Sequence, residues 1–178
     1  DKTAQEAQPQ PSLTAGQTAV LNDLLPRMNG YSANLLFGVT GSGKTEVYLR
    51  LIEAVLAQGK QALLLVPEIN LTPLLEARVA QRFPAVPVVS LHSEVTEAAR
   101  ARHFAAALTG EAQIVIGTRL AVFTPMPKLG LIITDEEHDP AYKQLEGMRY
   151  HARDLAVWRA HQTGVPIILG SATPSPES

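Results

Sequence analysis

The chain contains no cysteine among its 178 residues, which excludes a disulfide framework and a thiolate metal site. This absence suits a cytoplasmic location. The five histidines show no pairing at the spacing of metal ligands, so we expect no zinc in this segment. Net charge is also small, at −2. The chain therefore lacks the bulk positive charge that coats nucleic acid, and any such contact must be local.

The sequence also lacks a long apolar run. No stretch approaches the roughly 20 apolar residues that cross a bilayer, and no charged-then-apolar amino-terminal segment indicates export. With 46% hydrophobic residues, the chain can bury one core, which predicts a single compact domain. Residues 1–12 are polar and lack periodicity, so we expect a mobile leader or linker remnant there and an ordered domain over residues 13–178.

A glycine-rich segment fits the phosphate-binding pattern G-x-x-x-x-G-K-[ST] at residues 38–45. Its glycines let phosphate oxygens approach backbone amides, Lys44 reaches the outer phosphates, and Thr45 offers a hydroxyl to Mg²⁺. The alternative is a strand-to-helix turn that binds nothing, but a predicted strand (34–37) and helix (46–58) flank the segment and favour a nucleotide. The residues expected to bind ATP are Gly38, Thr40, Gly41, Ser42, Gly43, Lys44 and Thr45.

Two acidic residues, Asp135 and Glu136, follow an apolar run at 129–134. A carboxylate at the end of a strand lies at the sheet edge where ligands gather in open α/β folds. There Asp135 can hold Mg²⁺ through a water, and Glu136 can orient or deprotonate the attacking water. Such residues are often only solvated charges, but the phosphate-binding segment favours a catalytic set of Lys44, Asp135 and Glu136.

Strand-like and helical segments alternate along the chain. The predicted strands are nearly continuous in Leu, Ile and Val, which is typical of strands buried on both faces in a parallel sheet. They lie at residues 34–37, 61–66, 87–91, 113–117, 130–134 and 166–169. Besides 46–58, helices are predicted from the Thr14–Gln17 capping box onward and at 73–83, 96–108 and 151–163. The predicted fold is α/β, with a largely parallel sheet of about six or seven strands and helices on both faces.

Six segments together resemble the first RecA-like motor domain of a superfamily-two helicase, and within that group the primosomal replication-restart DNA helicases (the PriA family). They are GVTGSGKTEVY (38–48), VPEINLTP (66–73), IGTRLAVFTP (116–125), DEEHDPAYKQ (135–144), GMRYHARDLA (147–156) and GSATPS (170–175). The resemblance implies a RecA-like P-loop NTPase fold. It also implies an ATP-dependent 3′–5′ helicase that unwinds DNA in replication restart and primosome assembly.

The resemblance assigns roles to further residues near the nucleotide. Gln17 matches a glutamine whose amide reads the adenine edge, whereas its alternative role is the capping box with Thr14. His138 is expected to couple the hydrolysis site to Ser171 and Thr173. The alternative for these hydroxyls is an ordinary turn after the last strand.

Other segments are expected to contact single-stranded DNA. Pro67 and Glu68 follow the second predicted strand, while Thr118 and Arg119 follow the fourth, where they can reach phosphates. A basic, aromatic cluster matches a DNA-sensing loop of the family, in which rings and guanidinium planes stack on unpaired bases. The cluster consists of Tyr142, Lys143, Arg149, Tyr150 and Arg153. Alternatively, these tyrosines simply cover the rim of the core.

The resemblance also implies parts that lie outside this segment: a second RecA-like domain with an arginine finger, zinc-binding cysteines and an amino-terminal DNA-binding region. We expect the 178 residues alone to bind ATP–Mg²⁺ and to hydrolyse it poorly. Expected partners are single-stranded or forked DNA, the second RecA-like domain, and primosome and single-strand-binding proteins; no membrane is expected. A P-loop module with a nucleotide-stabilised docking role and no helicase activity remains the alternative.

Overall fold

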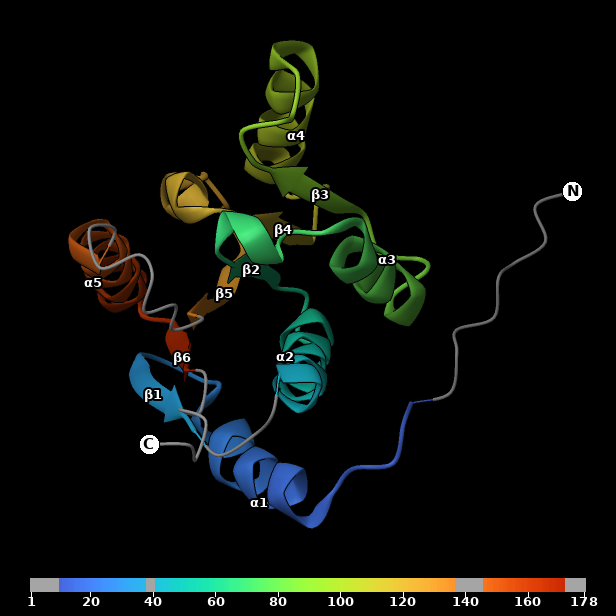
Figure 1. The fold of residues 1–178 in the computed structure, drawn as a ribbon, viewed down its shortest axis with the longest axis vertical. Helices are drawn as coiled ribbons and strands as arrows, with labels where there is room; N and C mark the ends of the chain where they lie inside the picture. The colour runs from blue at the N-terminus through green and yellow to red at the C-terminus, as the bar shows by residue number, and fades with distance from the viewer. Residues whose placement is uncertain (1–9, 38–40, 137–145, 172–178) are drawn as a thin grey trace, which may run out of the picture.

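A six-stranded parallel sheet forms the centre of the molecule (Figure 1). The structure, a computed structural model, describes residues 10–37, 41–136 and 146–171, without the side chains of residues 41, 42, 136 and 146–151. The strands are β1 (Ser32–Leu36), β2 (Gln61–Leu65), β3 (Val88–Leu91), β4 (Ile114–Gly117), β5 (Leu129–Glu136) and β6 (Pro166–Ser171). Their order is β1-β6-β5-β2-β4-β3, and every neighbouring pair is parallel. The predicted parallel α/β fold is confirmed.

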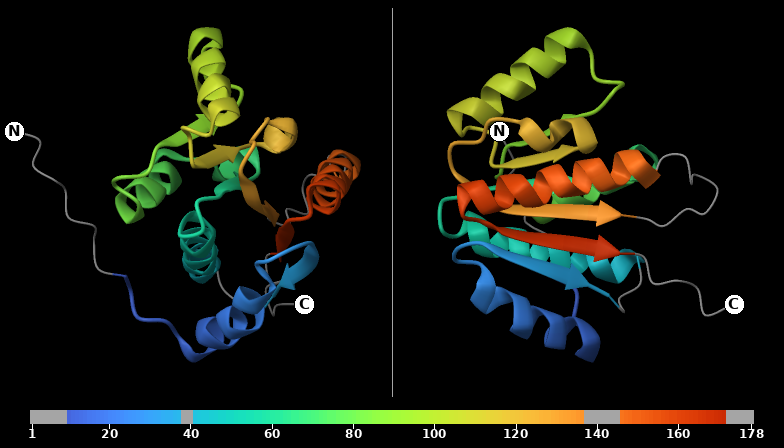
Figure 2. Two further views of the ribbon diagram at one scale, coloured as in Figure 1. Left: turned by 180° about the vertical axis from the view of Figure 1, so that it is seen from behind. Right: turned by 90° about the vertical axis from the view of Figure 1, so that its left-hand side faces the viewer.

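Five α-helices occur among the described residues: α1 precedes the first strand, and the other four lie between successive strands (Figure 2). They are α1 (Ala15–Leu24), α2 (Gly41–Leu56), α3 (Pro73–Arg82), α4 (Glu97–Thr109) and α5 (Glu146–Thr163), and the short 3₁₀ helices are η1 (Leu25–Arg27), η2 (Glu68–Asn70) and η3 (Arg119–Phe123). Thr14, Thr72 and Thr96 cap their helices through side-chain hydrogen bonds. Gly110 follows α4 with φ +83°, a left-handed angle suited to glycine at a helix end. Within the described part of the chain, no helix is both long and apolar enough to cross a membrane.

The two faces of the sheet bury separate apolar clusters, because successive strand residues point to opposite sides. On β2, Ala62 and Leu64 pack with residues of α1, α2 and α3, whereas Leu63 and Leu65 pack with residues of α4, η3 and α5. Figure 1 shows α2 and α3 on one side of the sheet and α5 on the other. Helices therefore cover both faces, as the continuous apolar strands predicted.

Several element boundaries differ from the sequence prediction, and three of them concern the segments with predicted functional residues. Helix α2 begins at Gly41 instead of residue 46. The prediction started too late because it relied on apolar spacing, which begins only at Val47. Strand β5 extends through Glu136, so Asp135 lies within the strand and not beyond it. Helix α5 begins at Glu146 instead of residue 151. Part of the segment interpreted as a DNA-sensing loop is therefore helical. The prediction missed this first part of α5 because apolar spacing is visible only from Ala152 onward.

Contacts with α2 reach back into the segment that the sequence assigned to a leader. The Gln10 side-chain amide donates to Glu53, and the Arg50 guanidinium donates to the Pro11 carbonyl at 2.8 Å. The contacts of the domain thus extend at least three residues before Leu13.

Candidate functional site

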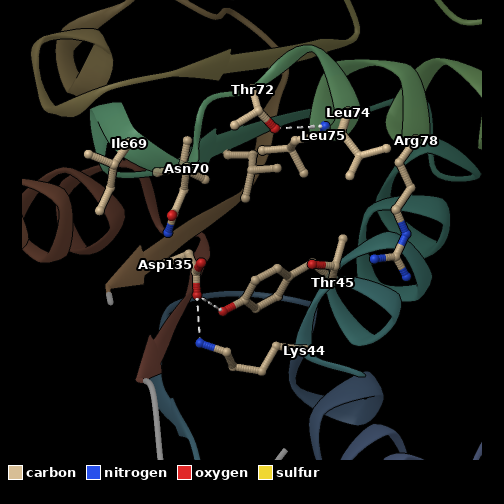
Figure 3. A pocket seen from close by; sticks show the side chains of 12 residues that line it. Lys44, Thr45, Ile69, Asn70, Thr72, Leu74, Leu75, Arg78 and Asp135 are labelled. Atoms are coloured by element: carbon tan, nitrogen blue, oxygen red, sulfur yellow. Dashed lines mark hydrogen bonds and ion pairs between the residues drawn. The ribbon is translucent and has the colours of Figure 1, made fainter. Parts of the chain in front are cut away.

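The first turn of α2 meets the end of β5 at the carboxyl edge of the sheet. Lys44 lies on α2, and its Nζ is 3.1 Å from Asp135 Oδ1 on β5 (Figure 3). These residues are 91 positions apart in the sequence. Their side chains are only 6% and 17% exposed, so the ion pair is strengthened by partial exclusion of water. The fold thus brings the two halves of the predicted phosphate site together.

Tyr48, to which the sequence analysis gave no role, completes this contact. Its hydroxyl donates to the same Asp135 oxygen at 2.6 Å. Burial raises the pKa of the Tyr48 phenol well above its usual value, and the charge of Asp135 and the hydrogen bond to it act in the same direction. The phenol therefore stays protonated and remains a donor. The available sequence clue was spacing, because positions four apart on a helix share a face.

A pocket of about 310 Å³ opens beside this ion pair. Lys44, Thr45 and Asp135 line one part, and residues of η2 and α3, among them Asn70 and Leu75, line the other (Figure 3). A hydroxyl and a carboxylate suit Mg²⁺, which proteins hold through one or two carboxylates together with substrate phosphates. No group of three or more metal-ligating residues is present among the described residues. The donor set thus fits Mg²⁺ held jointly with phosphates.

Gln17 joins α1 to the phosphate-binding segment. Its Oε1 accepts from the Thr14 amide at 2.9 Å, and its Nε2 donates to the Gly43 carbonyl at 3.1 Å. The capping box offered as its alternative role is therefore present. Both ends of the side-chain amide bond to protein, and its adenine-reading role stays a prediction.

A buried carboxylate beside Thr45 connects α2 to α3. Glu46 accepts from Arg50 at 2.9 Å and from Arg82 at 2.6 Å, and Arg78 lies 3.8 Å away. Burial by itself raises the pKa of Glu46, but the hydrogen bonds and charges of Arg82 and Arg50 outweigh it and hold the pKa below its usual value. The sequence shows the Glu46–Arg50 spacing but gives no indication of Arg82, 36 residues further on.

Two of the three segments predicted to contact DNA lie together at the same sheet edge. Pro67 and Glu68 follow β2, and Thr118 and Arg119 follow β4. These strands are neighbours, with Leu65 paired to Gly117. Glu68 and Arg119 are exposed, whereas Thr118 is buried. Both segments therefore occupy the edge that carries Asp135.

The structure describes only some of the remaining predicted site residues. Ser171 ends β6 and is paired with Glu136 of β5. The backbones of Ser42, Arg149 and Tyr150 belong to α2 and α5, without described side chains. Lying outside the described residues are Gly38, Thr40, His138, Tyr142, Lys143 and Thr173.

Comparison with known proteins establishes the family. Residues 14–178 match the DEAD/DEAH box helicase family. The chain belongs to this family. It is 52% identical over 150 residues to replication restart protein PriA of Haemophilus influenzae, covering 84% of this chain and 20% of that protein. It is 43% identical over 180 residues to PriA of Bacillus subtilis, covering 100% and 22%. The predicted resemblance to PriA is confirmed, and this helicase domain spans about a fifth of those relatives' length.

Solved structures support the same fold. The domain superposes on RecG bound to a three-way DNA junction with a TM-score of 0.67 and 23% identity, covering 95% of this chain and 22% of that one. It matches the DEAD-box helicase Mss116 bound to ssRNA with a TM-score of 0.68 and 19% identity, covering 93% and 36%. At these identities the likeness shows the fold alone, and the predicted RecA-like helicase fold is confirmed.

Proposed function

We propose that this chain is the ATP-binding motor domain of a PriA-like DNA helicase, which couples ATP hydrolysis to 3′–5′ unwinding of DNA in replication restart and primosome assembly. The observation that carries the proposal is the contact between Lys44 and Asp135, which both line the pocket. This contact supports the proposal, because a cation suited to phosphate oxygens and a carboxylate suited to Mg²⁺ lie 3.1 Å apart and can engage one ligand. The restart role is supported by the relatives' name, replication restart protein PriA.

In this proposal the chain binds and orients the nucleotide. Lys44 turns one or more of its three donors from Asp135 toward the outer phosphates. Thr45 and Asp135 are the residues that would hold Mg²⁺, and the ion would supply neutralisation of phosphoryl charge there. Glu136, next to Asp135, orients the attacking water and accepts its proton. Gln17 is proposed to read the adenine edge, which requires its side-chain amide to exchange its bonds with Thr14 and Gly43 for bonds to the base.

The proposed DNA track runs over the same edge of the sheet. Backbone amides near Pro67 and Thr118, together with the Arg119 guanidinium, contact phosphates and read no sequence. Tyr142, Lys143, Arg149 and Tyr150 add stacking and charge, and His138, Ser171 and Thr173 link DNA contact to hydrolysis. The proposed partners are single-stranded or forked DNA, the second RecA-like domain, and primosome and single-strand-binding proteins.

Equilibrium binding of a fluorescent ATP analogue tests the nucleotide site. Lys44→Ala removes a charge-assisted contact worth about 1.5–3 kcal/mol, so affinity should fall about 10- to 150-fold. The matched control is Lys128→Ala, because Lys128 is exposed and directly precedes β5, which puts it at the opposite edge of the sheet. Equal affinity of wild type and Lys44→Ala would remove the basis of the proposal.

Hydrolysis separates a motor from a docking module. The isolated chain should turn ATP over slowly with or without single-stranded DNA, because the arginine of a second domain is required for fast transfer. Glu136→Gln should abolish the remaining turnover while nucleotide binding persists, whereas a docking module would be indifferent to it. Robust DNA-stimulated turnover by the 178 residues would contradict the proposal that fast hydrolysis needs an arginine from a second domain.

A further inference from the structure

Two side chains of α2 and a glycine of β6 surround the Asp135 carboxylate. Lys44 and Tyr48 come from successive turns of α2, and both donate to Asp135 Oδ1, at 3.1 and 2.6 Å (the two dashed lines in Figure 3). Gly170 of β6 is the strand partner of Asp135. Tyr48 is only 3% exposed, so its ring is fixed by packing and its hydroxyl has one narrow site to occupy.

Gly170 supplies the space for that hydroxyl. A Cβ atom built on Gly170 would lie 1.6 Å from Tyr48 Oη, 2.9 Å from Tyr48 Cζ and 3.0 Å from Asp135 Oδ1. Any side chain there would displace the phenol from the carboxylate. A glycine inside a buried strand weakens the strand and often marks the close approach of another group. Here the group that approaches is Tyr48.

A bound nucleotide would affect the two donors to Asp135 differently. Under the function proposed above, Lys44 is drawn to phosphate oxygens, which weakens its hold on Asp135. Tyr48 is a neutral, buried donor one helical turn further from the phosphate-binding segment, and it has no such competing task. We propose that Tyr48 is a positioning residue, whose hydroxyl keeps the Asp135 carboxylate oriented for Mg²⁺ when Lys44 engages the triphosphate, in the space that Gly170 leaves open.

Loss of the Tyr48 hydroxyl should weaken only the metal-dependent part of nucleotide binding. A carboxylate has about four acceptor positions, so a bond to Tyr48 leaves capacity for a metal-bound water while limiting rotation. Loss of a group that orients a metal ligand typically weakens metal binding about 10- to 100-fold. Nucleotide binding without Mg²⁺ does not use this orientation and should be unchanged.

Tyr48→Phe tests the role, because it removes the hydroxyl and keeps the ring. The dissociation constant of a fluorescent ATP analogue is measured for the 178-residue chain with Mg²⁺ and with EDTA, and the ratio of the two values is the readout. Tyr48→Phe should lower the advantage given by Mg²⁺ about 10-fold and leave the EDTA value within about twofold. The matched control is Tyr31→Phe, at a tyrosine that is 41% exposed beside β1, which should leave the ratio unchanged.

Gly170→Ala provides a second, independent route to the same result. Its methyl group should displace the Tyr48 hydroxyl and reduce the Mg²⁺ advantage about as much as Tyr48→Phe does. Combining both substitutions should add little, within about twofold, because the hydroxyl that the methyl group would displace is already absent. A purely structural effect of the methyl group would instead lower affinity further in both backgrounds, with and without Mg²⁺.

The outcomes distinguish this role from the nucleotide function itself. If the wild-type chain binds no nucleotide, the proposed function fails and the role of Tyr48 falls with it. If the wild type shows a Mg²⁺ advantage that Tyr48→Phe and Gly170→Ala both retain, the positioning role alone is overturned. A loss by Tyr48→Phe that is equal with Mg²⁺ and with EDTA would likewise reject it, since it would indicate general disturbance of the pocket.

Discussion

Neutralising Glu46 should destabilise the domain far more than neutralising another glutamate of α2. Glu46 is 4% exposed in its side chain and faces Arg82, which is 10% exposed, and Arg50, which is 21% exposed. Glu46→Gln keeps the shape of the side chain and removes the charge that these guanidinium groups share. Among the described residues, Arg82 would then be a nearly buried cation without a counter-charge, and one of its nitrogens, Nη1, already has no hydrogen-bond partner there.

The magnitude follows from the burial of the pair. Removing one partner of a buried ion pair costs about 3–5 kcal/mol. We take the lower value, roughly 3 kcal/mol, because Arg50 is partly hydrated and Arg78, 36% exposed and 3.8 Å away, contributes little. For a chain of this length, that loss lowers the melting temperature by about 6–12 °C. Adding Arg82→Met should recover about 1–2 kcal/mol, because it removes the stranded charge.

The stability difference should depend on pH in one direction. The pKa of Glu46 is held below its model-compound value of 4.5 in the folded chain, so the folded state favours the charged carboxylate more than the unfolded state does. Its contribution is therefore complete above about pH 5 and is lost as the pH falls through the folded pKa. The gap between wild type and Glu46→Gln should be constant from pH 5 to 7, within about 0.5 kcal/mol, and should shrink below pH 4.5.

Urea denaturation followed by circular dichroism measures both quantities. The control is Glu53→Gln, an exposed position of the same helix, which should change the free energy of unfolding by no more than about 0.5 kcal/mol. The reasoning would be refuted by a Glu46→Gln loss as small as that control. A wild-type advantage that does not narrow in acid would refute it as well.

Three further substitutions test the packing around the site, each by thermal or urea denaturation. Gly117→Ala should cost about 1–3 kcal/mol, because a Cβ atom there would lie 2.3 Å from the Ala121 methyl carbon; no loss would mean that η3 shifts freely. Gln61→Leu should cost roughly 1–3 kcal/mol, because the buried side chain bonds to the Ala112 carbonyl and the Lys128 amide, whereas the Ala107 carbonyl keeps its bond from the Gly110 amide; a neutral result would mean that water replaces these bonds. Thr14→Ala should cost about 1 kcal/mol through loss of the cap on the Gln17 amide, and an unchanged melting temperature would show that this cap is dispensable.

Local pattern predicted most of the fold. Continuous apolar runs predicted all six strands of the described sheet, and glycines at positive φ ended helices where expected, at Gly110 and Gly164. Boundaries were missed where the sequence loses its periodicity, as at the glycine-rich start of α2 and the first turn of α5. The sequence of those turns has no apolar residues at helical spacing, so a prediction from periodicity cannot detect them.

The sequence by itself supplied the residues of the proposed site, namely the glycine-rich segment at 38–45 and the carboxylate on a later strand, and it predicted that they act on one ligand. The tertiary structure decided which side chains surround that carboxylate. Tyr48 reaches Asp135 across 87 positions, Gly170 leaves room for it, and Arg82 neutralises Glu46 across 36 positions. Spacing along a chain encodes which face of an element is apolar, but the partner opposite each residue depends on strand order and helix packing, and these are set only when the whole sheet assembles.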